Sequence, residues 1–116
     1  GARSVRCMRT ELGADAIVGA HCGNTRHDGL NAGEAGADYV SFGPVGNSDL
    51  GDGRVAELDL FRWWSEMVEV PVVAEGGLNL DLIRSLAPFT DFFGLGAEIW
   101  DQEDPVAALQ GFVAAM

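Results

Sequence analysis

Short apolar runs alternate with longer amphipathic stretches along the chain. The runs are nearly continuous in Val, Ile, Phe and Ala, which is typical of parallel strands covered on both faces. They occupy residues 16–20, 39–42, 70–74 and 92–95. Each run is followed by a glycine-containing loop and then by a helical stretch. The pattern therefore predicts four consecutive β-then-α units.

Capping residues mark where several helices begin and end. Asp104 before Pro105 is typical of an N-cap followed by the first helical residue. Thr25 and Asn79 are expected to cap two further helices, and Gly36 to close the one that Thr25 opens. A helix is also expected at the start of the chain, where one side is apolar.

The clearest helical pattern covers residues 57–69. Its apolar positions fall on one face and include Trp63 and Trp64, so both indoles are expected in the core rather than in a ligand cage. The last helix also has an apolar face. Its members are Val106, Leu109, Phe112, Val113 and Met116.

A helix followed by four strand–helix rounds predicts an α/β fold with a parallel sheet and right-handed crossovers. The pattern alone leaves an open doubly wound sheet and a barrel as alternatives. The chain has 116 residues, which we interpret as a single domain spanning 1–116. A complete (β/α)8 barrel needs roughly 200 residues or more. A barrel would therefore be represented here by about half of its length.

The chain is strongly acidic. Lys and Arg number 7 against 18 Asp and Glu, which gives a formal net charge of −11. Such a charge repels nucleic acid and anionic lipid, and no apolar run approaches the ~20 residues needed to span a bilayer. Two cysteines, Cys7 and Cys22, lack the spacing of a zinc site, so no metal ligands are expected in this chain. We expect a cytoplasmic protein that binds anions through backbone amides.

Glycines follow the predicted strands. Gly76 and Gly77 follow the third strand, and Gly94 and Gly96 bracket Leu95 at the end of the fourth. In a barrel, phosphate is often held at the ends of the last two strands. Gly76 and Gly77, ahead of a capped helix, would direct free amide N–H groups at an anion. The alternative is an ordinary turn that needs glycine for positive φ.

Three segments carry a family resemblance: GADYVSFGPV (36–45), VPVVAEGGLN (70–79) and TDFFGLGAEIW with the following EDP (90–105). They resemble the second half of thiamine-phosphate synthase and of its relative thiazole tautomerase. The resemblance implies that the chain is the second half of a (β/α)8 TIM barrel. Thiamine-phosphate synthases join hydroxymethylpyrimidine diphosphate to a thiazole phosphate, releasing pyrophosphate with Mg²⁺.

The same resemblance implies which residues bind substrate. Gly77, with Gly76 in the same loop, and the backbone at Gly96 and Ala97 would hold the thiazole phosphate. Ser48 would touch the same substrate or the pyrophosphate. The ligands of the implied Mg²⁺ belong to the first half of the barrel, so this chain would supply none.

Three positions depart from the family pattern. Gly51 stands where the synthases usually have a lysine that meets the diphosphate, and Gly19 where a serine is expected. Glu98 replaces a small or apolar residue beside the phosphate loop, where a carboxylate would oppose an anion unless it points away. We therefore expect this chain by itself to be inactive as a synthase.

His21 follows the first predicted strand, where the tautomerase has a histidine implicated in proton transfer. Histidine is the side chain best suited to acid–base chemistry near neutral pH, which makes His21 the candidate catalytic residue. The alternative is a hydrogen-bonded structural histidine. Glu75 is either an acid–base group or a carboxylate facing the pocket. An isomerase and a non-catalytic phosphate-binding module thus remain as alternatives to the synthase.

A half barrel exposes two sheet edges and one inner face, and such surfaces invite pairing. We therefore expect either that the natural protein is longer or that two copies associate as a homodimer.

Overall fold

The computed structural model describes residues 2–46 and 55–116. Within these residues, four parallel strands form one sheet in the order β1-β2-β3-β4. The strands are β1 (Gly19–His21), β2 (Tyr39–Phe42), β3 (Val72–Glu75) and β4 (Phe92–Gly94). The helices are α1 (Ala2–Leu12), α2 (Arg26–Glu34), α3 (Leu58–Met67), α4 (Leu80–Leu86), the 3-10 helix η1 (Ala87–Phe89), α5 (Ala97–Trp100) and α6 (Pro105–Ala115). The predicted alternation of parallel strands and helices is confirmed.

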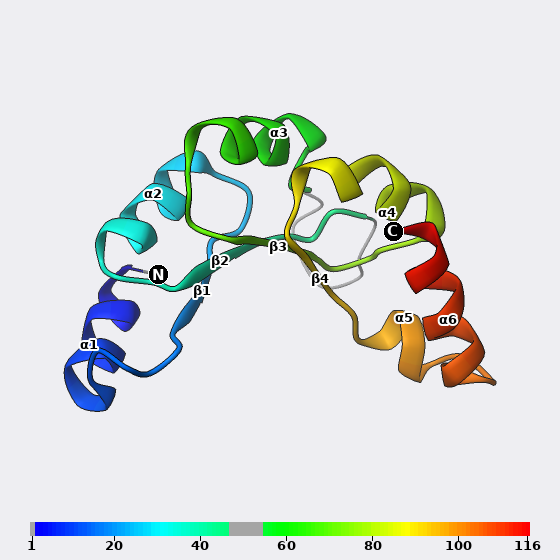
Figure 1. The fold of residues 1–116 in the computed structure, drawn as a ribbon, viewed down its shortest axis with the longest axis horizontal. Coiled ribbons are helices and arrows are strands. Elements are labelled where there is room, and N and C mark those ends of the chain that lie inside the picture. The colour runs from blue at the N-terminus through cyan, green and yellow to red at the C-terminus, as the bar shows by residue number, and fades with distance from the viewer. Residues whose placement is uncertain (1, 47–54) are drawn as a thin grey trace.

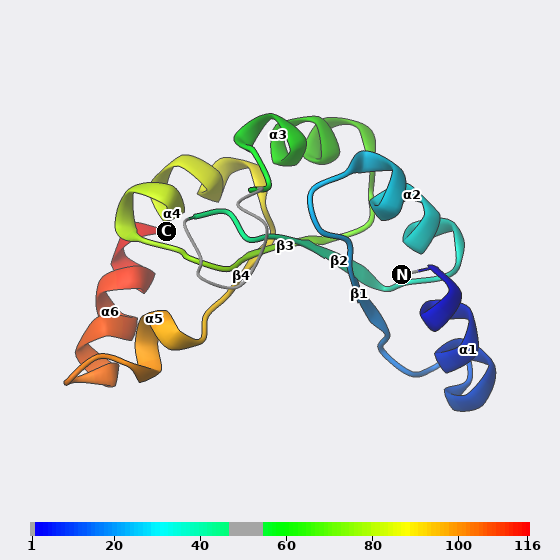
Figure 2. The ribbon, with the colours of Figure 1, turned by 180° about the vertical axis from the view of Figure 1, so that it is seen from behind.

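The sheet is curved, and the helices form an arc along its convex side (Figure 1). α2, α3 and α4 lie over the middle of the sheet, with α1 at one end and α6 at the other. Seen from behind, the arrangement is the same, and no described helix lies across the concave side (Figure 2). One face of each strand is therefore packed against helices, and the other faces an open hollow.

The hydrophobic core lies between the sheet and the convex layer of helices. Side chains alternate along a strand, so every second residue points to the helices. These positions are almost completely buried. They are Ala20, Val40, Phe42, Val72 and Ala74. The rings of Phe61 and Trp64 of α3 meet Phe42 edge to face, with centroids 5.8 and 5.2 Å away.

The two tryptophans of α3 differ in their surroundings. Trp64 is 1% exposed, and its indole N–H donates to the carbonyl of Val70 at 2.8 Å. The prediction of a core residue is confirmed for Trp64. Trp63 is only partly buried, and the Arg26 guanidinium lies 4.5 Å from its ring centroid. Trp63 thus lies at the periphery of the core, where its outer side makes a cation–π contact with Arg26.

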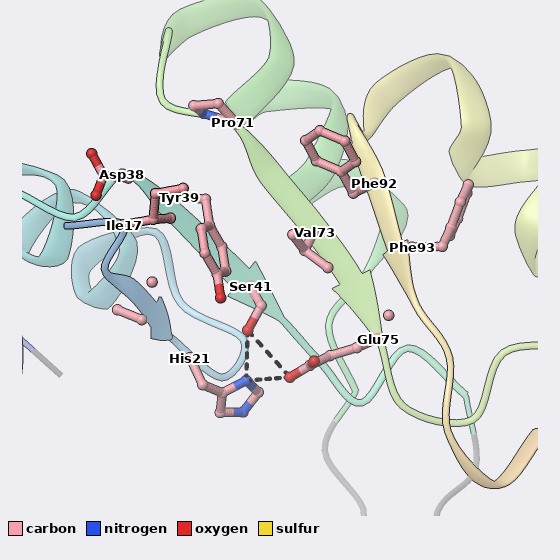
Figure 3. A pocket seen from close by; sticks show the side chains of 13 residues that line it. Ile17, His21, Asp38, Tyr39, Ser41, Pro71, Val73, Glu75, Phe92 and Phe93 are labelled. Atoms are coloured by element: carbon pink, nitrogen blue, oxygen red, sulfur yellow. Dashed lines mark hydrogen bonds and ion pairs between the residues drawn. The ribbon is translucent and has the colours of Figure 1, made fainter. Parts of the chain in front are cut away.

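The concave side is mostly apolar and is uncovered within the described residues. Ile17 is 82% exposed, Phe92 61% and Tyr39 38%. Together with neighbouring strand residues they line a hollow of about 840 Å³ (Figure 3). These are the side chains that would fill the interior of a closed barrel.

The first strand begins later than predicted. The expected run was 16–20, whereas β1 is Gly19–His21. The Arg9 guanidinium donates to the carbonyl of Ala16 at 2.6 Å, and the amide of Val18 donates to the Asp38 carboxylate at 2.7 Å. The residues before β1 are therefore held by the side chains of Arg9 and Asp38, together with one backbone hydrogen bond from the Asp38 amide to the Val18 carbonyl at 2.7 Å.

The expected caps are present. The side chains of Thr25, Asn79 and Asp104 each accept a hydrogen bond from the backbone N–H three residues later, at 3.2, 2.8 and 3.1 Å. Gly36 follows α2 with a φ of +102°. In α6, however, only Phe112 is buried, while the other four members of its predicted apolar face are 44–65% exposed. α6 contacts α4 and α5, and no described element covers its remaining apolar side.

No helix of the described residues is long and apolar enough to cross a membrane. Both cysteines are free, Cys7 exposed and Cys22 buried.

Candidate active site at the carboxyl ends of the strands

Three polar side chains meet where β1, β2 and β3 end. His21 is paired with Ser41 in the sheet register, and Ser41 with Val73. Glu75 lies two residues after Val73, on the same face. The register thus turns His21, Ser41 and Glu75 to the concave side, where Figure 3 shows them pointing toward one another.

The three groups form a closed hydrogen-bonded triangle. His21 Nδ1 lies 2.9 Å from Glu75 Oε1 and 3.1 Å from Ser41 Oγ. The Ser41 hydroxyl donates to the same Glu75 oxygen at 3.2 Å. Ser41 is buried, at 6% exposure, whereas the His21 and Glu75 side chains are 55% and 39% exposed. Ser41 is therefore the buried member of the triangle, and His21 and Glu75 are the members that a ligand can reach.

Two glycines on the same face leave room for neighbouring side chains, Gly94 for Glu75 and Gly19 for Tyr39. A Cβ at Gly94 would lie 3.1 Å from Glu75 Cβ and 3.2 Å from its Oε2. A Cβ at Gly19 would collide with the ring of Tyr39, which lies across the strand there. The serine expected at position 19 would therefore not fit beside Tyr39 as it is placed.

A second hollow, of about 430 Å³, opens at the ends of β3 and β4, and we call it the strand-end cleft. Its lining consists of His21, Gly43, Pro44, Glu75, Gly76, Gly94, Leu95, Gly96 and Glu98. Gly76 and Gly96, predicted from separate loops, thus face one cleft, and His21 joins them there. His21, Glu75 and Gly94 also line the concave hollow, so they stand at the boundary between the two spaces.

The backbone of the Gly76–Gly77 turn requires glycine. Both residues have positive φ, +85° and +73°, and a Cβ at Gly76 would lie 2.8 Å from Pro44 Cα. The Gly76 carbonyl accepts from the amides of Val45 and Gly46 at 2.8 and 3.0 Å. The loops after β2 and β3 are thereby tied together, which fixes the edge of the strand-end cleft.

Backbone amides remain available at this edge. The N–H groups of Gly77, Gly96 and Ala97 donate to no acceptor within residues 2–46 and 55–116. Gly77 and Ala97 adjoin the strand-end cleft without being part of its lining. Ser48 and Gly51 lie outside the described residues. A phosphate-binding role for Ser48, Gly76, Gly77, Gly96 and Ala97 thus stays a prediction.

Glu98 lies in the first turn of the short helix α5, which the sequence patterns did not predict, and lines the strand-end cleft. It also lines the neighbouring hollow between α4, α5 and α6. Its Oε2 atom is buried without a hydrogen-bond partner among the described residues. The carboxylate therefore does not turn away into solvent.

Ser41 was missed by the sequence interpretation because it lies inside an apolar run. The available signal was a small polar residue in a strand otherwise made of the aromatic and aliphatic residues Tyr39, Val40 and Phe42. A buried polar side chain needs a hydrogen-bond partner, and the partners of Ser41 are His21 and Glu75.

The described part of the chain brings no three His, Cys, Asp or Glu side chains together as a metal site. These residues do not fit a bound Mg²⁺, which remains a prediction from the resemblance.

Comparison with known proteins places this geometry in a family. The family model described as thiamine monophosphate synthase matches residues 2–90. The thiamine-phosphate synthase of Erythrobacter litoralis is 40% identical over 108 residues, covering 90% of this chain and 50% of that protein. The chain belongs to the thiamine monophosphate synthase family.

Further proteins with thiamine-phosphate names are similar to this chain over nearly its whole length. The thiamine-phosphate synthase of Rhodospirillum centenum is 39% identical, over 96% of this chain and 55% of that protein. The solved thiamine phosphate pyrophosphorylase of Pyrococcus furiosus superposes with a TM-score of 0.82 at 28% identity, over 96% of this chain and 53% of that one. The chain spans about half the length of the relatives that it matches. The prediction of half a TIM barrel from this family is confirmed.

Proposed function

We propose that the strand-end cleft binds the phosphate of a thiazole phosphate and that, in a complete barrel, the bound thiazole is joined to hydroxymethylpyrimidine diphosphate with release of pyrophosphate. One observation carries this proposal. In a chain 40% identical to a thiamine-phosphate synthase, Gly76 and Gly96 line one cleft at the ends of neighbouring strands. The protein would then act in thiamine biosynthesis.

Backbone amides would supply the positive end of the interaction. The N–H groups of Gly77, Gly96 and Ala97 have no acceptor among the described residues, and the cleft lining formed by those residues contains no Lys or Arg. Unpaired N–H groups at loops and helix starts bind phosphate well because several dipoles point at one anion. The ligand oxygens would satisfy donors that otherwise depend on water.

Isothermal titration of the complete protein with thiazole phosphate tests the proposal. We expect saturable binding that is lost with the same thiazole lacking its phosphate. Glu98→Gln should tighten binding by up to about fivefold, because two like charges about 4 Å apart in water repel by roughly 1 kcal/mol. Glu103→Gln is the matched control, since Glu103 is exposed and outside the cleft lining. No heat of binding from a folded protein would refute the proposal.

A second candidate is a thiazole tautomerase-like isomerase, which needs no diphosphate substrate. The contacts of His21 with Glu75 and Ser41 favour it, because they hold an imidazole at the rim of the cleft. NMR of thiazole phosphate incubated without the pyrimidine substrate separates the two functions. Isomerisation that His21→Ala abolishes without weakening phosphate affinity would identify the isomerase. Binding without turnover in either assay would instead identify a non-catalytic phosphate-binding module.

A further inference from the structure

The triangle of His21, Ser41 and Glu75 constrains where the imidazole carries its proton. The Ser41 hydroxyl donates to Glu75 Oε1 at 3.2 Å, so its hydrogen is not available to His21. Ser41 Oγ, 3.1 Å from His21 Nδ1, can then only accept from that nitrogen.

Glu75 leads to the same assignment. A carboxylate oxygen is an acceptor, and it lies 2.9 Å from His21 Nδ1. An unprotonated Nδ1 would face two oxygen lone pairs at hydrogen-bonding distance, which is repulsive. A protonated Nδ1 faces two acceptors. The contacts therefore favour the neutral tautomer with hydrogen on Nδ1 and a lone pair on Nε2.

The other ring nitrogen faces away from the triangle. In Figure 3 two of the three dashed contacts end on the same nitrogen of the His21 ring, and the second ring nitrogen points away from Ser41 and Glu75. That nitrogen makes no hydrogen bond with any residue of 2–46 or 55–116. His21 and Glu75 line both the concave hollow and the strand-end cleft. A ligand anchored in the cleft by its phosphate would place its ring beside this nitrogen.

We propose that Glu75 and Ser41 are positioning residues that fix His21 as a base at Nε2. This inference rests on the proposed binding of a thiazole phosphate. In the step it describes, the Nε2 lone pair takes a proton from the bound heterocycle, and the bonding electrons stay on the substrate. The resulting imidazolium lies against the Glu75 carboxylate, and the same proton returns to the substrate from Nε2. A neighbouring carboxylate favours the charged form of the histidine as the proton moves.

The nitrogen-15 NMR spectrum of the imidazole in the complete protein tests the positioning directly. At a pH of about 8.5, where histidine side chains are ordinarily neutral, we expect the signals of an Nδ1-protonated ring. Replacement of Glu75 by Gln keeps the length of the side chain and removes its charge. The Glu75→Gln variant should shift the ring toward the Nε2-protonated tautomer. A wild-type ring protonated at Nε2 would overturn the proposal without any variant.

Steady-state kinetics of the isomerisation of thiazole phosphate provide the second readout. Glu75→Gln should lower kcat by at least about tenfold and change KM by no more than about twofold, because the lost interaction acts on proton transfer rather than on binding. Glu66→Gln is the matched control, since Glu66 pairs with Arg62 on the exposed side of α3. If Glu75 merely tied strand ends together, Glu75→Gln would lower the stability of the protein and leave the tautomer and kcat unchanged. That result would refute the inference.

Failure of the proposed function is distinguishable from failure of this inference. A wild-type protein that binds and converts no thiazole phosphate contradicts the proposed function. The tautomer of His21 in the same sample still decides whether Glu75 and Ser41 position the ring.

Discussion

Gly29 and Gly33 lie four residues apart in the same helix, and the structure predicts opposite effects of an alanine at each. A Cβ at Gly29 would lie 2.6 Å from Trp64 Cζ3 and 2.7 Å from Phe42 Cζ. Both rings are at most 1% exposed, so neither has open space to move into. A Cβ at Gly33 would meet only Val70 Cγ2, at 3.7 Å, which is ordinary van der Waals contact.

Two terms of similar size oppose each other at Gly29. Alanine stabilises a helix interior by up to about 1 kcal/mol relative to glycine. Forcing an extra carbon into a packed core costs typically about 1–3 kcal/mol. Because two rings are hit at once, we expect the packing cost to win and Gly29→Ala to lower the free energy of unfolding by about 1 kcal/mol. Gly33→Ala retains only the helical term, so it should raise that free energy by up to about 1 kcal/mol.

Urea denaturation of the complete protein measures both variants. With a slope of roughly 2 kcal/mol per M, a difference of about 2 kcal/mol separates the two midpoints by about 1 M. An unchanged slope would show that the denatured state is not responsible. If Gly29→Ala raised the midpoint as much as Gly33→Ala, the close approach of α2 to the aromatic core would be refuted.

The remaining predictions concern residues where β1 and β2 begin. The hydrogen bond from Arg9 and, to a smaller extent, that from the Val18 amide hold the pKa of Asp38 below its ordinary value. The ionised Asp38 therefore stabilises the folded protein above about pH 4, and this stabilisation is lost as pH falls through the lowered pKa. Urea midpoints of wild type and Asp38→Asn should therefore differ near neutral pH and converge in acid, and a gap independent of pH would contradict this. Gly19→Ser should destabilise the protein in the presence of the Tyr39 ring but much less in a Tyr39→Ala background, and additive effects in that double-mutant cycle would exclude the collision.

The element order and several boundaries could be predicted because they depend on local chemistry. The run 39–42 coincides with β2, and the Thr25, Asn79 and Asp104 caps act on the amides that their spacing indicates. Each of these signals involves residues within a few positions of one another. Local patterns are sufficient where the stabilising partner is also local.

Other features depend on partners far along the chain. The run 16–20 is apolar enough for a strand, but the Arg9 guanidinium bonds the Ala16 carbonyl and the Asp38 carboxylate bonds the Val18 amide, so the strand begins only at Gly19. Gly29 resembles a weak helix position until the rings of Phe42 and Trp64 are placed against it. The exposed face of α6 shows the opposite case, because its sequence is apolar and no described element covers it. Burial is set by what packs there, which the pattern of one helix does not contain.

The candidate site was partly predictable for the same reason. His21, Gly76 and Gly96 follow predicted strands, and parallel strands bring their carboxyl ends to one edge, so their meeting at the cleft follows from topology. The Ser41–Glu75 contact does not, because it depends on the stagger between β2 and β3. Val73, rather than Glu75, is the register partner of Ser41.

The charges around the strand-end cleft also differ in kind, although both acidic side chains of its described lining are glutamates. The Glu75 carboxylate accepts a hydrogen bond from the Ser41 hydroxyl and contacts His21. A proton that moves to His21 would place a positive charge beside this carboxylate. The buried oxygen of Glu98 has no such partner within the described residues. A dianion held by the amides near Gly76 and Gly96 would therefore be opposed mainly by Glu98. Anion affinity and proton transfer should thus be separable by mutation, the first through Glu98 and the second through Glu75.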